Sequence, residues 1–242
     1  MRLPLTARLA AFAALALTAT ALLSSPARAQ AVAGSPGSGD TFKDTSQLKL
    51  PAGQRAAIYE FEDLECPACA HAFPIVHAAV DRYKIPLLRH DFPLHEIHVW
   101  STEAAITARY LQDKVSADAG EQFRRDVFAS QLSINSKDDL LNFTRKWFQG
   151  HNQQLPFVVD PTRRFAAEVQ ADRTLGERLG LLHTPTIFVI SPRGWTQVTD
   201  VGQLYATIDK ALAESPVKAA ATAAPAKPAP HNNVRKAATP QK

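Results

Sequence analysis

Both cysteines of this chain lie in one short motif, Cys66-Pro67-Ala68-Cys69. Residues 56–61, before the motif, predict a strand, and residues 67–83 repeat apolar side chains at helical spacing. The motif therefore stands where a strand ends and a helix begins. Free backbone N–H groups and the dipole of a helix N-terminus stabilise an anion, so this position favours a thiolate at Cys66. Pro67 suits the first helical turn, because the N–H that it lacks would have no partner there.

Two cysteines this close could also form a structural disulfide or bind a metal. A disulfide between Cys66 and Cys69 would close a two-residue loop, and the stabilisation from a disulfide grows with loop length. A zinc or copper site would need further ligands, for which His71 or the segment His95-Glu96-Ile97-His98 is available. Haem attachment requires a histidine directly after the second cysteine, where this chain has Ala70. We favour a redox dithiol in which Cys69 resolves mixed disulfides, with the metal site as the alternative.

The apolar pattern of the remaining chain predicts a mixed α/β fold. Residues 86–92 predict a second strand, and residues 186–190 form a β-branched run typical of a buried strand. A weaker strand and a last helix follow at residues 195–198 and 202–213. Between the second strand and the buried strand, helical periodicity covers four segments: residues 102–112, 119–130, 137–149 and 161–179. The expected order is β-α-β, then helices, then β-β-α.

This combination resembles the thioredoxin superfamily, and within it the DsbA-like thiol:disulfide oxidoreductases. The strand–CxxC–helix unit is followed, more than a hundred residues later, by Thr184-Pro185 and a buried strand. The helical pattern between Phe92 and Pro185 resembles the helical insertion of DsbA-type proteins. The resemblance covers about residues 50–213. It implies a thioredoxin-like α/β fold with a helical insertion, at about residues 100–180, between the βαβ and ββα halves.

The resemblance also assigns roles around the dithiol. It makes Cys66 and Cys69 the catalytic pair, with Pro67 and Ala68 supporting the site. Glu60, six residues before Cys66, matches the buried glutamate of DsbA proteins, and a raised pKa would suit it for proton exchange with Cys69. Ala68 stands where DsbA proteins have a histidine, which implies a less oxidising motif. The acidic residues between Glu60 and Cys66 are expected to oppose a thiolate.

A second group of expected site residues precedes the buried strand. By resemblance, Pro185 is cis and faces the dithiol, and the backbone of Thr184 pairs with the substrate chain. Thr184 stands where DsbA proteins typically have valine, and in this it resembles the isomerases DsbC and DsbG. His183, two residues before Pro185, is expected either to face Cys66 or to be an ordinary exposed histidine of the loop. Three further histidines, at positions 90, 95 and 98, are interpreted as structural or surface groups.

The implied function is an enzyme that introduces disulfides into client proteins through mixed disulfides. Its partners would be cysteine-containing proteins and a membrane quinone-linked protein of the DsbB or vitamin K epoxide reductase type, which reoxidises Cys66 and Cys69. The resemblance implies a monomer without organic cofactor or metal, in which the redox-active group is the Cys66–Cys69 disulfide. The alternative is a reductase or isomerase that uses the same residues, because the sequence does not set the redox potential.

The ends of the chain differ from its middle. Residues 1–29 are typical of a secretory signal, with Arg2 and Arg8, an apolar stretch and the cleavage pattern Ala27-Arg28-Ala29, and an uncleaved anchor is the alternative. We therefore expect a periplasmic or secreted protein, cleaved near Ala29. Residues 30–47 are interpreted as a flexible leader, 48–214 as the folded domain, and 215–242 as a disordered Ala/Pro/Lys-rich tail.

The basic pI of about 9.1 arises from these ends. All 23 acidic residues lie within residues 30–214, whereas eight of the 27 basic residues lie outside them. The predicted domain is therefore mildly acidic. Since nucleic-acid binding requires a basic surface on the folded part, the sequence predicts no nucleic-acid partner.

Overall fold

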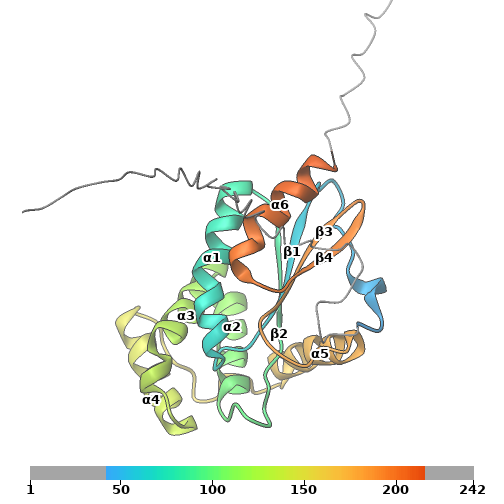
Figure 1. Ribbon diagram of the computed structural model, residues 1–242. Coiled ribbons are helices and arrows are strands. Elements are labelled where there is room, and N and C mark those ends of the chain that lie inside the picture. The colour runs from blue at the N-terminus through green and yellow to red at the C-terminus, as the bar shows by residue number, and fades with distance from the viewer. Residues whose placement is uncertain (1–41, 216–242) are drawn as a thin grey trace, which may run out of the picture. The chain divides into compact units, whose positions relative to one another are not determined.

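The computed structural model describes residues 42–215 (Figure 1). The predicted signal at residues 1–29, most of the leader and nearly all of the tail lie outside the described residues. The elements are β1 (Ala57–Glu62), α1 (Pro67–Tyr83), β2 (Leu87–Asp91), α2 (Ser101–Lys114), α3 (Ala117–Ser130), α4 (Lys137–Gly150), α5 (Arg164–Leu179), β3 (Thr186–Ser191), β4 (Gly194–Val198) and α6 (Leu204–Ala213), with three short 3-10 helices at Thr45–Gln47, Gln131–Ser133 and Val201–Gln203. The predicted order of strands and helices is confirmed.

The four strands form one sheet in the order β2-β1-β3-β4. Strands β1 and β2 are parallel, because α1 returns the chain across the sheet, and the other neighbouring pairs are antiparallel. Ile58 packs with residues of α1 and α6 on one face, whereas Phe61 packs with residues of α5 on the other. Strand β1 is central and buried along its whole length, so its end delivers the dithiol from the most fixed part of the sheet.

The helical insertion shares a hydrophobic core with the start of α1. This core contains both cysteines and Phe73 of α1, together with Trp100, Phe123 and other apolar residues from α2, α3 and α4. The indole Nε1 of Trp100 donates a hydrogen bond of 3.0 Å to the carbonyl of Ile134. The insertion therefore packs around the dithiol, and Figure 1 shows its helices α2 and α3 beside α1.

One predicted helix boundary is corrected by the structure, and one contact lies in the segment interpreted as a leader. In that segment, Phe42 packs edge-on against Phe188, with ring centroids 5.0 Å apart. Helix α5 begins at Arg164 and not at Pro161, because Arg163 adopts a left-handed conformation (φ 57°) at the helix start. The Asp160 carboxylate accepts a hydrogen bond from the N–H of Ala166, which occupies one of the free donors in the first turn.

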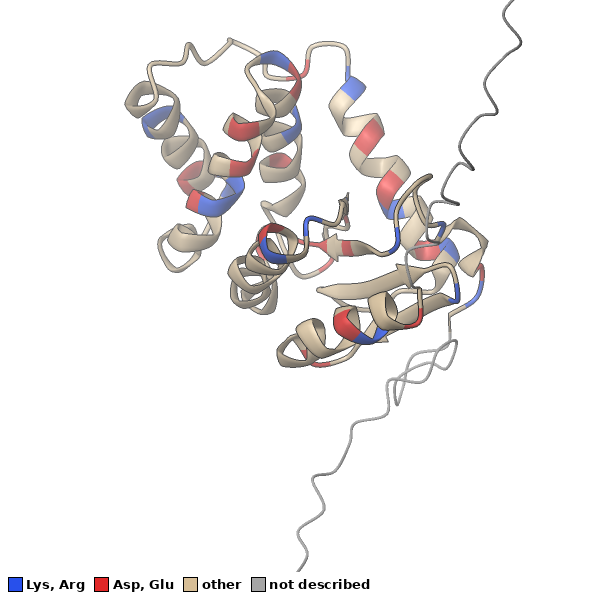
Figure 2. Cartoon of the chain, turned by 90° about the horizontal axis from the view of Figure 1, so that it is seen from above, with Lys and Arg blue, Asp and Glu red and all other residues tan. Residues whose placement is uncertain are grey.

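Charged residues of both signs are interspersed on the helices (Figure 2). Each of the six α-helices contains at least one acidic and one basic residue. Within residues 42–215, no helix is long and apolar enough to cross a bilayer.

Candidate active site

The dithiol lies where β1 passes into α1. Cys66 is the N-cap residue of α1, with extended backbone, and Pro67 occupies the first helical turn as predicted. Cys66 is 7% exposed and Cys69 is 1% exposed, and both are free thiols in this structure. The accessible sulfur is therefore that of Cys66, at the end of the helix where its N–H groups are free.

The surroundings of Cys66 stabilise its thiolate. A hydrogen bond from the Cys69 thiol is the main reason why the pKa of Cys66 is lowered from 9.0 to about 6, and the backbone N–H groups of Cys69 and Ala68 contribute. Burial acts in the opposite direction. Contrary to expectation, none of the leading influences on the Cys66 pKa is a carboxylate. Cys66 therefore has the character of a nucleophile at neutral pH.

Cys69 has the opposite character. Burial raises its pKa well above 9.0, and the charges on Cys66 and Glu62 raise it further. The backbone N–H of Asp63 donates a hydrogen bond of 3.4 Å to the Cys69 sulfur. The acidic residues before the motif thus act on the second cysteine, through Glu62, rather than on the first. The pair consists of one thiolate and one protonated thiol.

Glu60 is buried in the middle of β1, on the same side of the strand as Ile58 and Glu62. Neither of its carboxylate oxygens has a hydrogen-bond partner within residues 42–215. Burial, assisted by the charge on Glu62, raises the pKa of Glu60 from 4.5 to about 8. Glu60 is thus protonated at neutral pH, whereas the carboxylate whose charge reaches Cys69 is Glu62. Proton exchange between Glu60 and Cys69 stays a prediction.

The loop before β3 meets the dithiol. The Thr184–Pro185 peptide bond is cis, and when Cys66 carries its proton the thiol donates a hydrogen bond of 3.3 Å to the carbonyl oxygen of Thr184. Thr184 is buried, and His183 is exposed, with its carbonyl accepting a hydrogen bond from Thr186. The structure therefore brings Thr184 to Cys66, and the approach of the His183 side chain to Cys66 stays a prediction.

The thioredoxin family model matches residues 53–222. The chain belongs to the thioredoxin family. Similar solved structures include alpha-DsbA1 of Wolbachia pipientis, with a TM-score of 0.57 and 17% identity over 71% of this chain and 98% of that one. BdbD of Bacillus subtilis has a TM-score of 0.53 and 17% identity, and the match covers 68% of this chain and 89% of that one. DsbA2 of Pseudomonas aeruginosa has a TM-score of 0.51 and 18% identity, and the match covers 72% of this chain and 93% of that one. No curated protein sequence matches the chain.

At these identities the likeness shows the fold, and it confirms the predicted thioredoxin-like architecture with a helical insertion. Within the described residues, no group of three or more histidine, cysteine, aspartate or glutamate side chains could hold a metal ion.

In this thioredoxin-family fold, a buried ionic network that the sequence did not reveal lies beside the dithiol. Arg124 of α3 donates from Nη1 to Glu62 at 2.8 Å and to Asp91 at 2.7 Å. All three side chains are at most 2% exposed. Although burial raises the pKa of Asp91, the charges of Arg124 and Arg109 lower it to about 2. The insertion thus supplies the cation that neutralises the carboxylates at the ends of β1 and β2.

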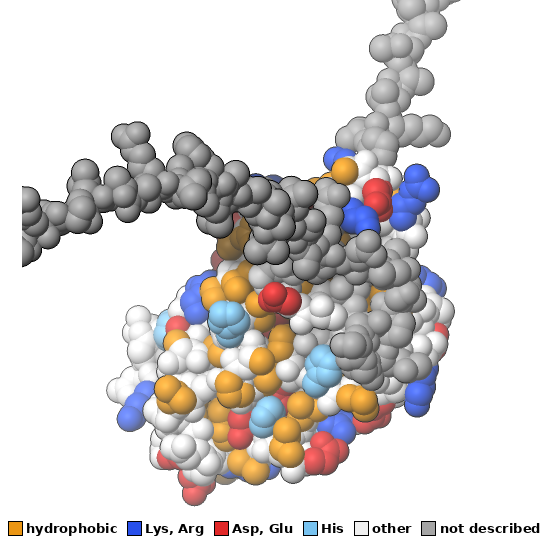
Figure 3. Space-filling model, viewed as in Figure 1, with side chains coloured by type: hydrophobic (Ala, Val, Ile, Leu, Met, Phe, Trp, Pro, Cys, Tyr) orange, Lys and Arg blue, Asp and Glu red, His pale blue; other side chains and the backbone are white. Residues whose placement is uncertain are grey.

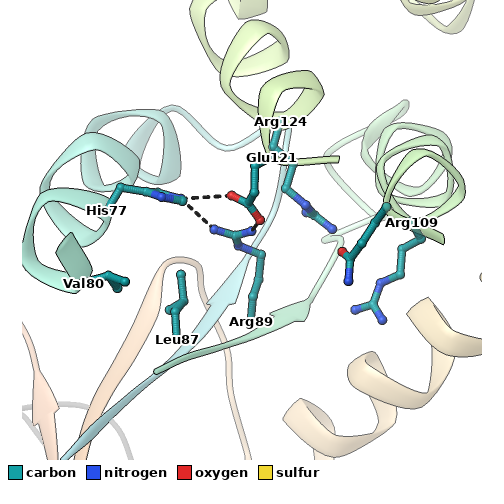
Figure 4. A pocket seen from close by; sticks show the side chains of 8 residues that line it. His77, Val80, Leu87, Arg89, Arg109, Glu121 and Arg124 are labelled. Carbon is teal, nitrogen blue, oxygen red and sulfur yellow. Dashed lines mark hydrogen bonds and ion pairs between the residues drawn. The ribbon is translucent and has the colours of Figure 1, made fainter. Parts of the chain in front are cut away.

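The network opens into a cavity of about 390 Å³ (Figure 4). Its lining residues come from α1, β2, α2 and α3: His77, Val80, Leu87, Arg89, Arg109, Gln112, Glu121 and Arg124. Nε2 of His77 lies 2.8 Å from Nη2 of Arg89 and 3.2 Å from Glu121, and Arg89 also pairs with Glu121 (Figure 4). The cavity therefore adjoins the network through Arg89, Arg109 and Arg124.

Residues of the insertion also form hydrogen bonds with the segment that joins β1 to α1. Nε2 of Gln131 donates to the carbonyl oxygens of Leu64 at 2.8 Å and Cys66 at 3.1 Å. The Glu65 carboxylate accepts a hydrogen bond of 2.7 Å from the N–H of Trp100. These contacts join segments 35 to 67 residues apart, which is why periodicity along the chain could not predict them.

Proposed function

We propose that the chain is an exported thiol:disulfide oxidoreductase that introduces disulfides into client proteins through Cys66 and Cys69. The observation that carries the proposal is the asymmetry of the dithiol. The pKa of Cys66 is lowered to about 6, mainly by the hydrogen bond from Cys69, whereas burial raises the pKa of Cys69. This supports Cys66 as the sulfur that clients attack and Cys69 as the resolving thiol.

The reaction starts from the Cys66–Cys69 disulfide. A client thiolate attacks the sulfur of Cys66, the Cys66–Cys69 bond breaks, and Cys69 leaves as a thiolate that takes a proton from water. A second client thiolate then attacks the client sulfur of the mixed disulfide, so that the client is oxidised and Cys66 leaves as a thiolate. A low pKa makes Cys66 a good leaving group. The electrons remain on the dithiol, and no organic cofactor or metal is needed.

The direction of electron flow follows from the stability of the reduced form. Values of about 3.5 for DsbA and about 7 for thioredoxin bracket the Cys66 pKa of about 6, which is set first by the Cys69 hydrogen bond. This supports an oxidant weaker than DsbA. Thr184 beside the thiolate supports the alternative, a reductase or isomerase. The equilibrium constant with glutathione decides between an oxidase and a reductase or isomerase. A redox potential of about −270 mV, that of thioredoxin, would exclude the oxidase.

Two segments that contact Cys66 lie beside exposed apolar side chains. Leu132 follows Gln131, which binds the carbonyl of Cys66, and Leu182 precedes the Thr184 loop. Figure 3 shows apolar side chains and histidines gathered on one face. These features support protein clients as substrates. We further propose that clients pair with the backbone at Thr184 and Pro185 beside His183, and that Glu60, supported by Pro67 and Ala68 in the same site, assists proton exchange.

The proposal includes export and reoxidation. The signal at residues 1–29 would be cleaved near Ala29, and the folded domain and basic tail would then act in the periplasm or outside the cell. A quinone-linked membrane protein of the DsbB or vitamin K epoxide reductase type would reoxidise the dithiol of the monomer. Sequencing the N-terminus of the exported protein tests the cleavage. An exported protein that still contains Arg2 would indicate the uncleaved anchor.

A matched pair of serine variants tests the mechanism. Cys66→Ser should abolish thiol–disulfide exchange, because the reacting sulfur is gone. Cys69→Ser should accumulate the mixed disulfide with Cys66, because its resolving thiol is gone. Non-reducing electrophoresis after reaction with a disulfide-containing peptide measures both. Unchanged exchange by Cys66→Ser would exclude the mechanism.

A further inference from the structure

Asp63 places one hydrogen-bond donor on the resolving cysteine. The residue directly follows β1, and its backbone N–H lies 3.4 Å from the Cys69 sulfur. Cys69 is 1% exposed, so water is almost excluded from this sulfur. A charge that develops on a buried atom depends on the fixed donors around it.

The Asp63 side chain is held by three donors. Oδ1 accepts from the N–H of Glu65 at 2.7 Å, and Oδ2 accepts from the N–H of Leu94 at 2.7 Å. The third donor is Nδ1 of His98, 2.7 Å from Oδ2. The Asp63 carboxylate is fully buried and the His98 ring is 15% exposed, so each hydrogen bond compensates for lost hydration. His98 is the only side chain among these three donors, and it comes from the segment between β2 and α2.

This donor lies at the sulfur on which charge develops when the Cys66–Cys69 bond breaks. When a client thiolate attacks Cys66, the electron pair of the Cys66–Cys69 bond passes to Cys69. The charge appears on a sulfur whose pKa is raised by burial, so the transition state is costly. The N–H of Asp63 stabilises that charge, provided that the backbone of Asp63 stays in place.

We propose that His98 is a positioning residue that, by holding the Asp63 carboxylate, keeps the Asp63 N–H directed at the sulfur of Cys69 during disulfide exchange. This inference rests on the proposed function, because it concerns a step of that reaction. It assigns a role in exchange to a histidine whose position in the sequence suggested a structural or surface group, or a ligand of the alternative metal site.

His98→Leu removes the donor, and His98→Asn keeps an N–H at the position of Nδ1. His95→Leu is the matched control, since His95 lies in the same segment, is 55% exposed and pairs only with the exposed Glu96 among the ion pairs of residues 42–215. The measurement is the rate of exchange with glutathione in both directions, by quenching and separation of the redox forms. Complete removal of one stabilising donor lowers a rate roughly 10²- to 10³-fold. Because His98→Leu would only displace the Asp63 N–H, we expect the exchange rate to fall by about tenfold.

The expected result is that His98→Leu slows exchange about tenfold in both directions and leaves their ratio unchanged. The transition state loses stabilisation, whereas the end states, with Cys69 as disulfide or as thiol, do not. His98→Asn and His95→Leu should retain the wild-type rates. Wild-type rates in His98→Leu, a changed equilibrium ratio at unchanged rates, or equal slowing in His98→Asn would each overturn the proposal.

If His98→Leu does not fold, His98→Gln, whose amide reaches one bond farther, carries the test. It should be slower than His98→Asn, and equal rates for the two would overturn the proposal. Failure of the proposed function has a different signature, since the wild-type protein itself would then either not exchange disulfides or reach an equilibrium with glutathione that excludes an oxidase.

Discussion

Glu60 makes the stability of the protein depend on pH in a way that one substitution can remove. Because burial and the charge on Glu62 raise its pKa from 4.5 to about 8, the folded protein keeps a proton that the unfolded chain releases. Stability is therefore greatest below the unfolded pKa and falls as pH rises toward 8. The decline is ~1.4 kcal/mol per pH unit and reaches ~3 kcal/mol at pH 7. Glu60→Gln cannot ionise, so this decline should disappear.

The assay requires the disulfide form of the protein. In the reduced protein, the hydrogen bond from Cys69 lowers the pKa of Cys66 from 9.0 to about 6. That group stabilises the folded state as pH rises above 6, with a slope of the same size and opposite sign. Between pH 6 and 8 the two effects would cancel. Oxidation removes the thiolate and leaves the contribution of Glu60 alone.

Urea unfolding of oxidised wild type and Glu60→Gln, at several pH values between about 5 and 8, measures the slopes. Glu96→Gln is the matched control, because Glu96 is exposed, and hydrogen bonding to its own backbone lowers its pKa, as does the charge of Arg173. It is ionised throughout this range, so the control should keep the wild-type slope. Parallel pH dependences in wild type and Glu60→Gln would refute the argument that Glu60 is protonated at neutral pH.

Two further predictions concern packing around the insertion. Arg124→Met leaves Glu62 as a buried carboxylate without its main cation and should lower the free energy of unfolding by ~3–5 kcal/mol, whereas Arg125→Met, at the exposed neighbouring position, should change it by less than ~0.5 kcal/mol. Gly176→Ala would place Cβ 2.4 Å from the ring of Phe92 and should cost ~1–3 kcal/mol, although alanine favours helices. Gly150→Ala, with no atom within 4 Å of its Cβ, should be neutral or stabilising, and equal effects of the two alanines in urea unfolding would contradict this.

The order of the elements was predictable because apolar periodicity is local. The β-branched run at residues 186–190 became β3, and the helical periods between residues 102 and 179 became α2 to α5. The start of α5 was predicted three residues too early, because the left-handed backbone of Arg163 leaves no mark on the apolar pattern. The dithiol was predictable for the same reason as the strands, since Cys66, Pro67 and Cys69 are neighbours in the chain.

The partners of the dithiol were less predictable, because they come from distant segments. Arg124 reads as one more charge on an amphipathic helix, and only the fold brings it to Glu62, 62 positions earlier. His98 contacts Asp63 across 35 positions, and no periodic signal connects them. The acidic run was interpreted from its distance to Cys66 along the chain, whereas in space Glu62 acts on Cys69. Here the spacing along the chain identifies the reacting groups, whereas tertiary contacts shift their pKa values.

The contact between Cys66 and Thr184 spans 118 positions of the chain. While the protein is being synthesised, Cys66 emerges long before the residue whose carbonyl it meets. Even the N–H donors of the first turn of α1 depend on tertiary packing, since packing provides most helix stability in proteins. A growing chain therefore lacks the contact at Thr184, and the difference in reactivity between its two thiols is complete only when the last third of the domain has folded. The rate at which Cys66 is alkylated can accordingly be used to measure when folding of the domain is complete.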